Sequence, residues 1–133
     1  MAAVYIDTSA LVALFLASDR SHETAARAFA RLAEEGAPLY TSSYVVVETC
    51  ALLDRRVGRE AVLRFRSEFA PLLRVLWVDE ELHEAGLDRL AGQRGAGLSF
   101  VDATSLAAMR RLGLERAFAF DELFSREGYE LVN

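Results

Sequence analysis

The chain has 133 residues, which fits a single domain over residues 1–133, and 53% of them are hydrophobic, enough for a well-buried core. With a net charge of −5, the protein as a whole does not attract nucleic acid, so any affinity for RNA must be local or depend on cations. The single cysteine, Cys50, excludes an intramolecular disulfide and a cysteine zinc site. No secretory pattern and no bilayer-length apolar stretch is present, so we expect a cytoplasmic protein.

Short β-rich runs alternate with helical stretches along the chain. In chain order the pattern predicts a strand at 3–6, helices at 8–17 and 22–35, a strand at 38–41, a helix from about 43 to 56, a helix at 59–73, a central strand at 74–78, helices at 80–93 and 99–112, and strands at 117–120 and 129–132. This alternation favours a three-layer α/β/α fold with a mainly parallel sheet. Such folds bind ligands beyond the carboxyl ends of their strands.

Four acidic residues stand at positions that suit such a site. Asp7 directly follows the first strand, and Asp121 directly follows the strand at 117–120. Asp102 lies in the first turn of a helix, and Glu48 lies within an otherwise uncharged helical stretch. A charge in that stretch needs a partner if it is buried, either an arginine such as Arg55 or a bound cation.

Each of these acids also has an ordinary structural explanation. Asp7 and Asp121 could cap the helical turns that follow them, because Asp is a favoured cap residue. Asp102 lies three residues after Ser99, which is the spacing of a capping box. Glu48 could pair with an arginine or point into solvent. No single acid therefore establishes a site.

The four acids taken together point to a metal ion. Two unit charges about 6 Å apart repel by roughly 3 kcal/mol at an effective dielectric constant near 20, so several such pairs need compensation. Carboxylate and water oxygens suit Mg²⁺ or Mn²⁺, whereas a site without His or Cys does not suit zinc. The sequence therefore predicts a carboxylate metal site.

The segments around these acids resemble the motifs of PIN-domain nucleases, and among them the VapC-type toxins of bacterial and archaeal toxin–antitoxin pairs. The resemblance covers essentially the whole chain, and four motifs carry it in the family's order. They are Val-Tyr-Ile-Asp-Thr-Ser-Ala-Leu at 4–11, Thr-Ser-Ser-Tyr-Val-Val-Val-Glu at 41–48, Leu-Ser-Phe-Val-Asp-Ala at 98–103 and Phe-Ala-Phe-Asp-Glu-Leu-Phe at 118–124.

The resemblance implies a Mg²⁺- or Mn²⁺-dependent endoribonuclease that is neutralised by an antitoxin protein and forms a homodimer. We expect Asp7 and Asp102 to hold the principal metal ion, Asp121 to share that ion or a second one, and Glu48 to act directly or through water. Hydroxyl groups beside these acids are candidates for orienting the carboxylates, although each could equally serve as a helix cap. They belong to Thr8, Ser9 and Ser99.

Arginines are candidates for binding the phosphates of RNA, because the guanidinium group suits bidentate phosphate contacts. For any single arginine a solvated surface position is the more ordinary explanation. The candidates are Arg55, Arg56, Arg59, Arg94, Arg110 and Arg111.

Other protein classes fit the residues less well. A phospho-acceptor receiver domain and a haloacid-dehalogenase-type phosphatase both need a lysine, and the chain contains none. The phosphatase also needs a second Asp where Ser9 stands. A PIN fold kept only as a binding module and a housekeeping RNA-processing nuclease both remain alternatives.

Overall fold

The computed structural model describes residues 2–92 and 97–133. Its centre is a five-stranded sheet in the order β3-β2-β1-β4-β5, and every neighbouring pair is parallel. The sheet confirms the predicted α/β class. Its strands are β1 (Val4–Ile6), β2 (Leu39–Ser42), β3 (Arg74–Leu76), β4 (Arg116–Phe118) and β5 (Glu130–Val132).

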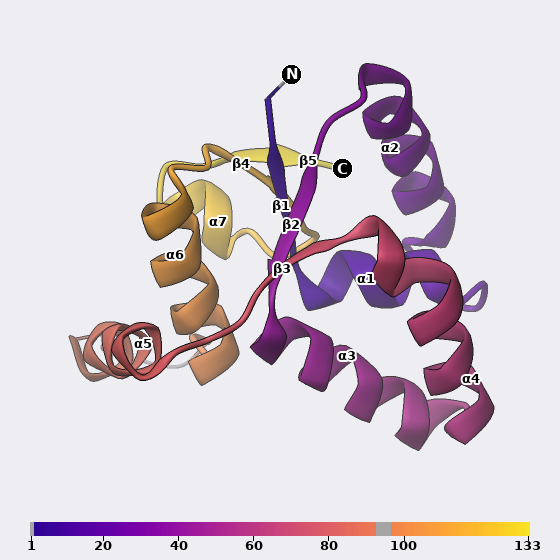
Figure 1. Cartoon of the computed structure of the whole chain (residues 1–133). Coiled ribbons are helices and arrows are strands. Elements are labelled where there is room, and N and C mark those ends of the chain that lie inside the picture. The colour runs from indigo at the N-terminus through magenta and orange to yellow at the C-terminus, as the bar shows by residue number, and fades with distance from the viewer. Residues whose placement is uncertain (1, 93–96) are drawn as a thin grey trace.

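Helices cover both faces of this sheet. Helices α1, α2 and α4 lie to one side, and α5, α6 and α7 lie to the other (Figure 1). Helix α3 begins where β2 ends and runs beneath the sheet towards α4 (Figure 1). The helices are α1 (Thr8–Phe15), α2 (His22–Glu35), α3 (Ser43–Arg56), α4 (Arg59–Arg64), α5 (Glu80–Gly92), α6 (Phe100–Leu112) and α7 (Leu123–Arg126).

The helix predicted at 59–73 was wrong beyond residue 64. After α4 the chain forms a π-helical turn at Phe65–Phe69 and a 3-10 turn at Ala70–Leu72. The rings of Phe65 and Phe69 stack with centroids 6.2 Å apart and both pack edge-on against Phe15. Pro71 then offers no backbone N–H to a longer α-helix.

The strand predicted to be central, at 74–78, lies instead at the edge of the sheet as β3 and ends at Leu76. The side chain of Trp77 is 73% exposed. The apolar run is explained by one-sided packing, because Val75 and Leu76 are only half-buried against the core. Smaller differences are that α1 ends at residue 15 and that β4 ends at residue 118.

The strands nearest the site are deeply buried. All three side chains of β1 are inaccessible to solvent, and so is Phe118 at the end of β4. Gly86 lets α5 approach α6, because a Cβ atom there would lie 2.5 Å from Thr104 Oγ1. No helix among the described residues is long and apolar enough to cross a membrane.

Candidate active site

Asp7 lies at the junction of β1 and α1 and is 4% exposed. Its backbone N–H donates to the carbonyl of Phe118 over 3.0 Å, which ties the end of β1 to the end of β4. Asp7 occupies the N-cap position of α1, yet its side chain makes no capping hydrogen bond. Capping therefore does not explain why a carboxylate is buried at this position.

Ser9 holds one oxygen of this carboxylate. Its hydroxyl donates to Asp7 Oδ2 over 3.1 Å and accepts from the backbone N–H of Phe120 over 3.0 Å. Asp7 Oδ1 and the Thr8 hydroxyl are buried without a hydrogen-bond partner. One oxygen of the carboxylate is thus fixed by the protein, and the other is left as a buried acceptor.

The surroundings of Asp7 favour its protonated form. Burial, followed by the nearby charge of Asp102, raises the pKa of Asp7 from 3.8 to about 6. The Ser9 hydroxyl and the nearby backbone N–H groups of Thr8 and Ser9, whose geometry falls short of a hydrogen bond to Asp7, lower the pKa, but less than burial raises it. A buried carboxylate that is destabilised in this way gains from a nearby cation.

Asp102 takes part in the N-terminal cap of α6, and its carboxylate is close enough to Asp121 and Glu48 to feel their negative charges. Its backbone N–H donates to Ser99 Oγ over 3.0 Å, and its Oδ2 accepts from the Ser99 N–H over 3.2 Å. This is the capping box expected from the spacing. Burial raises the pKa of Asp102, the contacts with Ser99 lower it, and the charges of Asp121 and Glu48 raise it further. The fold therefore brings Glu48 and Asp121 near Asp102, and Asp102 near Asp7.

Asp121 lies three residues beyond β4 rather than directly after it, because β4 is shorter than predicted. Its Oδ1 accepts from the backbone N–H of Leu123 over 2.9 Å, so it caps the turn that leads into α7. Glu48 is half-buried on α3. Within the described residues it forms no ion pair with Arg55 or any other arginine.

The four carboxylates do not form a closed cage. Within residues 2–92 and 97–133, no three His, Cys, Asp or Glu side chains converge closely enough to hold a metal ion. Like charges favour this separation, and hydrogen bonds tie one oxygen each of Asp102 and Asp121 to the backbone. The set still fits a hard divalent cation, because it supplies oxygen ligands and because Asp7 Oδ1 has no partner.

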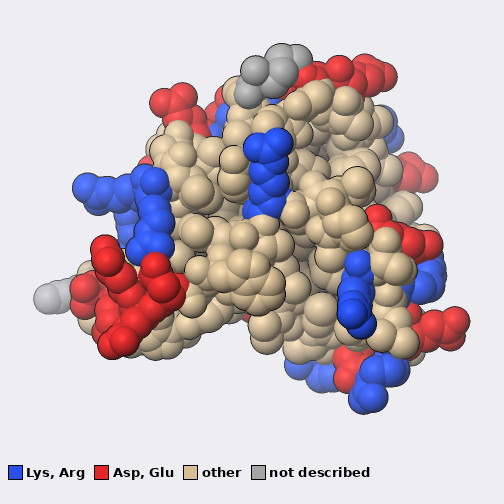
Figure 2. Space-filling view, viewed as in Figure 1, with Lys and Arg blue, Asp and Glu red and all other residues tan. Residues whose placement is uncertain are grey.

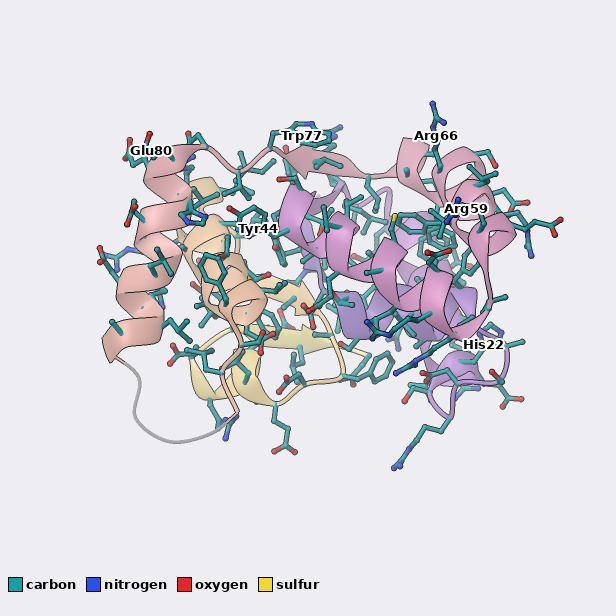
Figure 3. All side chains as sticks on the ribbon, turned by 90° about the horizontal axis from the view of Figure 1, so that it is seen from below. His22, Tyr44, Arg59, Arg66, Trp77 and Glu80 are labelled. Atoms are coloured by element: carbon teal, nitrogen blue, oxygen red, sulfur yellow. The ribbon has the colours of Figure 1, made fainter. Side chains whose placement is uncertain are left out.

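Sequence reasoning missed two features near these acids. Tyr44 and His83 are hydrogen-bonded, and both pack edge-on against Phe100, two residues before Asp102. Figure 3 shows Tyr44 between α3 and α5. The second feature is Arg20, which lines a cavity together with Ser9. Nothing in the local sequence marks these residues, because their neighbours come from distant segments.

The arginines expected to meet phosphate differ in their contacts. Arg59 pairs with Asp54 over 3.5 Å, and Arg111 pairs with Asp79 over 3.1 Å. No ion pair of Arg55, Arg56 or Arg110 is found within the described part of the chain. Arg94 lies outside the described residues, as does the predicted helix end at residue 93.

The fold and these side chains define an α/β domain with a carboxylate-rich site at the end of a parallel sheet. Residues 4–128 match the PIN domain family, and the chain belongs to this family. PIN-domain nucleases generally use a divalent metal ion. The resemblance seen in the four motifs is thereby confirmed.

Within the family, the chain is similar to proteins named 23S rRNA-specific endonuclease VapC20 from Mycobacterium tuberculosis strains CDC 1551 / Oshkosh and H37Rv. Each is 39% identical over 127 residues, which cover 95% of this chain and 95% of the relative. The crystal structure of the M. tuberculosis VapC20, described as a Sarcin-Ricin loop cleaving toxin, has a TM-score of 0.83 at 37% identity, with 96% of each chain covered.

More distant structures share the fold. A toxin–antitoxin complex from Klebsiella pneumoniae has a TM-score of 0.67 at 19% identity and covers 98% of this chain and 97% of its own. The DNA-bound VapBC complex from Salmonella typhimurium has a TM-score of 0.67 at 15% identity, with the same shares covered.

Proposed function

We propose that the chain is a Mg²⁺- or Mn²⁺-dependent endoribonuclease of the VapC type, with Asp7, Glu48, Asp102 and Asp121 as its catalytic carboxylates. The observation that carries the proposal is the state of Asp7. Its carboxylate is buried at the end of the central strand, one oxygen has no partner, and its pKa is raised to about 6. A structural carboxylate would be paired or exposed, whereas a metal ligand is left free for its ion.

In this site Asp7 Oδ1 and the carboxylate of Asp102 would hold the principal ion, and Asp121 would share it or hold a second. A divalent ion bound there would acidify a water molecule and stabilise charge on the departing oxygen of a phosphodiester. Ser9 orients Asp7 through its hydrogen bond to Oδ2. Glu48 is half-buried near Asp102, where it can accept a proton from water.

Ribosomal RNA is the first substrate to test, because the VapC20 relatives are named for 23S rRNA cleavage. Such an enzyme would work in the cytoplasm, where ribosomes are. We also infer an antitoxin partner and a homodimer. Exposed apolar side chains support a protein contact, since Trp77 is 73% exposed and Val47 is 66% exposed. The N–H of Val78 donates to Ser43 Oγ, which brings the Trp77 segment to the first turn of α3, one turn before Val47.

The Asp102→Asn variant tests the proposal. An Asn side chain can still accept from the Ser99 N–H, so the cap of α6 is kept while the charge is lost. We expect cleavage of ribosomal RNA in Mg²⁺ to fall by at least about 100-fold, with a melting temperature close to that of the wild type. Asp88→Asn, an exposed substitution on α5, is the matched control and should cleave normally.

Removal of the metal completes this test. EDTA should abolish cleavage, and added Mg²⁺ or Mn²⁺ should restore it. Mapping the cut sites by sequencing the RNA ends would identify the substrate. Cleavage that persists in EDTA, or that Asp102→Asn leaves unchanged, would refute the proposed mechanism.

A further inference from the structure

A cavity of about 290 Å³ opens beside the hydroxyl group that holds Asp7. Ser9 and Phe120 form part of its wall. The same Ser9 hydroxyl donates to Asp7 Oδ2 and accepts from the Phe120 N–H. An occupant of this cavity would therefore lie one side chain away from the buried carboxylate.

Two arginines from different segments of the chain line this cavity. Arg20 comes from the segment between α1 and α2, and Arg56 is the last residue of α3. Both are exposed, and neither takes part in an ion pair within residues 2–92 and 97–133. Guanidinium groups without a carboxylate partner remain available to an external anion.

The rest of the cavity wall leaves it net positive. Asp19 is the acid in the wall, and its Oδ1 accepts from the backbone N–H of Ser21 over 2.8 Å. Ser21 is the N-cap of α2 but makes no side-chain capping bond, so the positive end of this 14-residue helix also faces the region. A helix of this length carries roughly half a positive charge at its N-terminus. Two cations and a helix dipole thus outweigh one engaged carboxylate.

The surface around α5 has the opposite character. This helix begins with Glu80 and Glu81, and acidic side chains gather over it (Figure 2). A cavity of about 390 Å³ between α5 and α6 is lined by Glu81, Asp88, Arg89, Arg110 and Arg111. Two of these arginines are already paired with acids, Arg89 with Glu127 and Arg111 with Asp79. In a chain of net charge −5, the acidic surface of α5 repels a polyanion, whereas both arginines of the cavity lined by Arg20 and Arg56 lack an ion pair among the described residues.

We infer that the cavity between Arg20 and Arg56 is a subsite for one backbone phosphate of the RNA, next to the phosphate that is cleaved. This inference rests on the proposed function and adds a specific contact to it. The two guanidinium groups bind the phosphate, while Ser9 continues to hold Asp7. Because these arginines contact a phosphate that does not react, they determine how tightly RNA binds and where it is cut, not the rate of the chemical step.

The test compares Arg20→Gln, Arg56→Gln and the double variant with Arg66→Gln. Arg66 is exposed, is not part of the cavity wall and points away from the protein (Figure 3). Binding of a fluorescent single-stranded RNA is measured in EDTA over a series of salt concentrations. We expect each cavity variant to bind about tenfold more weakly. The double variant should also lower the salt dependence of log K by about 0.7, the value of one phosphate contact on a single strand.

Cleavage in Mg²⁺ then separates binding from chemistry. The cavity variants should raise KM by the same factor while kcat stays close to that of the wild type. RNAs with one neutral methylphosphonate linkage locate the contact. One flanking position should weaken binding to the wild type by about tenfold and have no further effect on the double variant.

The inference is overturned if the cavity variants behave like Arg66→Gln, or if every methylphosphonate position affects the wild type and the double variant equally. It is also overturned if the variants bind RNA normally and lose only the binding of a protein partner. Wild-type protein that binds RNA through Arg20 and Arg56 but does not cleave it would refute the proposed function and leave the subsite intact.

Discussion

Asp7→Asn should stabilise the metal-free protein at neutral pH, although it removes a residue of the proposed site. Burial, and then the charge of Asp102, raise the pKa of Asp7 from 3.8 to about 6. The folded state therefore holds this proton more tightly than the unfolded state. The stability linked to Asp7 is complete below about pH 4 and is lost as the pH rises through 6. A shift of about two pKa units corresponds to about 3 kcal/mol.

Urea denaturation in EDTA measures this difference. The Asn variant should be more stable than the wild type by up to about 3 kcal/mol near pH 8, and the difference should vanish near pH 4. The amide oxygen can still accept from Ser9, so the hydrogen bond at Oδ2 is kept. Asp88→Asn removes an exposed charge and should leave the free energy of unfolding within about 0.5 kcal/mol of the wild type.

Adding Mg²⁺ should reverse the order of stabilities. A cation that binds the folded wild type stabilises it in proportion to the logarithm of its concentration, whereas the Asn variant gains little. The reasoning fails if Asp7→Asn is no more stable than the wild type near pH 8 in EDTA. It also fails if the advantage is the same near pH 4, because a pH-independent gain would come from packing and not from the charge.

Two further substitutions test the framework around the site. Ser9→Ala leaves the Phe120 N–H without its acceptor, so the free energy of unfolding measured in urea should fall by about 1–2 kcal/mol. Single-turnover cleavage by this variant should slow by about 10- to 100-fold. Gly86→Ala forces a Cβ atom against Thr104 and should lower the free energy of unfolding, measured in urea, by about 1–3 kcal/mol. Gly92→Ala on the same helix meets open space and serves as its control; equal effects at both glycines would contradict the packing argument.

The order of strands and helices was predictable because each element carries its own local pattern. The helix at 22–35 has the predicted bounds, since Gly36 ends it with a φ of 69° that glycine adopts easily. The capping box that opens α6 was likewise visible in the spacing of Ser99 and Asp102. Hydrogen bonds between residues three or four apart depend little on the rest of the chain.

The arrangement of the strands was less predictable. An apolar run indicates that a segment is buried on at least one side, but it does not indicate which strands lie next to it in the sheet. For this reason β3 was expected at the centre of the sheet and lies at its edge. The π-helical turn at Phe65–Phe69 packs against Phe15, which lies fifty residues before Phe65 in the chain.

For the site, the sequence by itself determined which four acids to consider. It also placed three of them at the beginning or end of an element and Glu48 within an otherwise uncharged helix. Only the tertiary structure decided that Asp7 is buried with one free oxygen, while Asp102 and Asp121 each accept a backbone N–H with one oxygen. It also placed Arg20 beside Ser9. The physical reason is that burial, electrostatic field and hydrogen-bond partners come from neighbours in β1, α3, α6 and the segment after β4, which meet only in the folded chain.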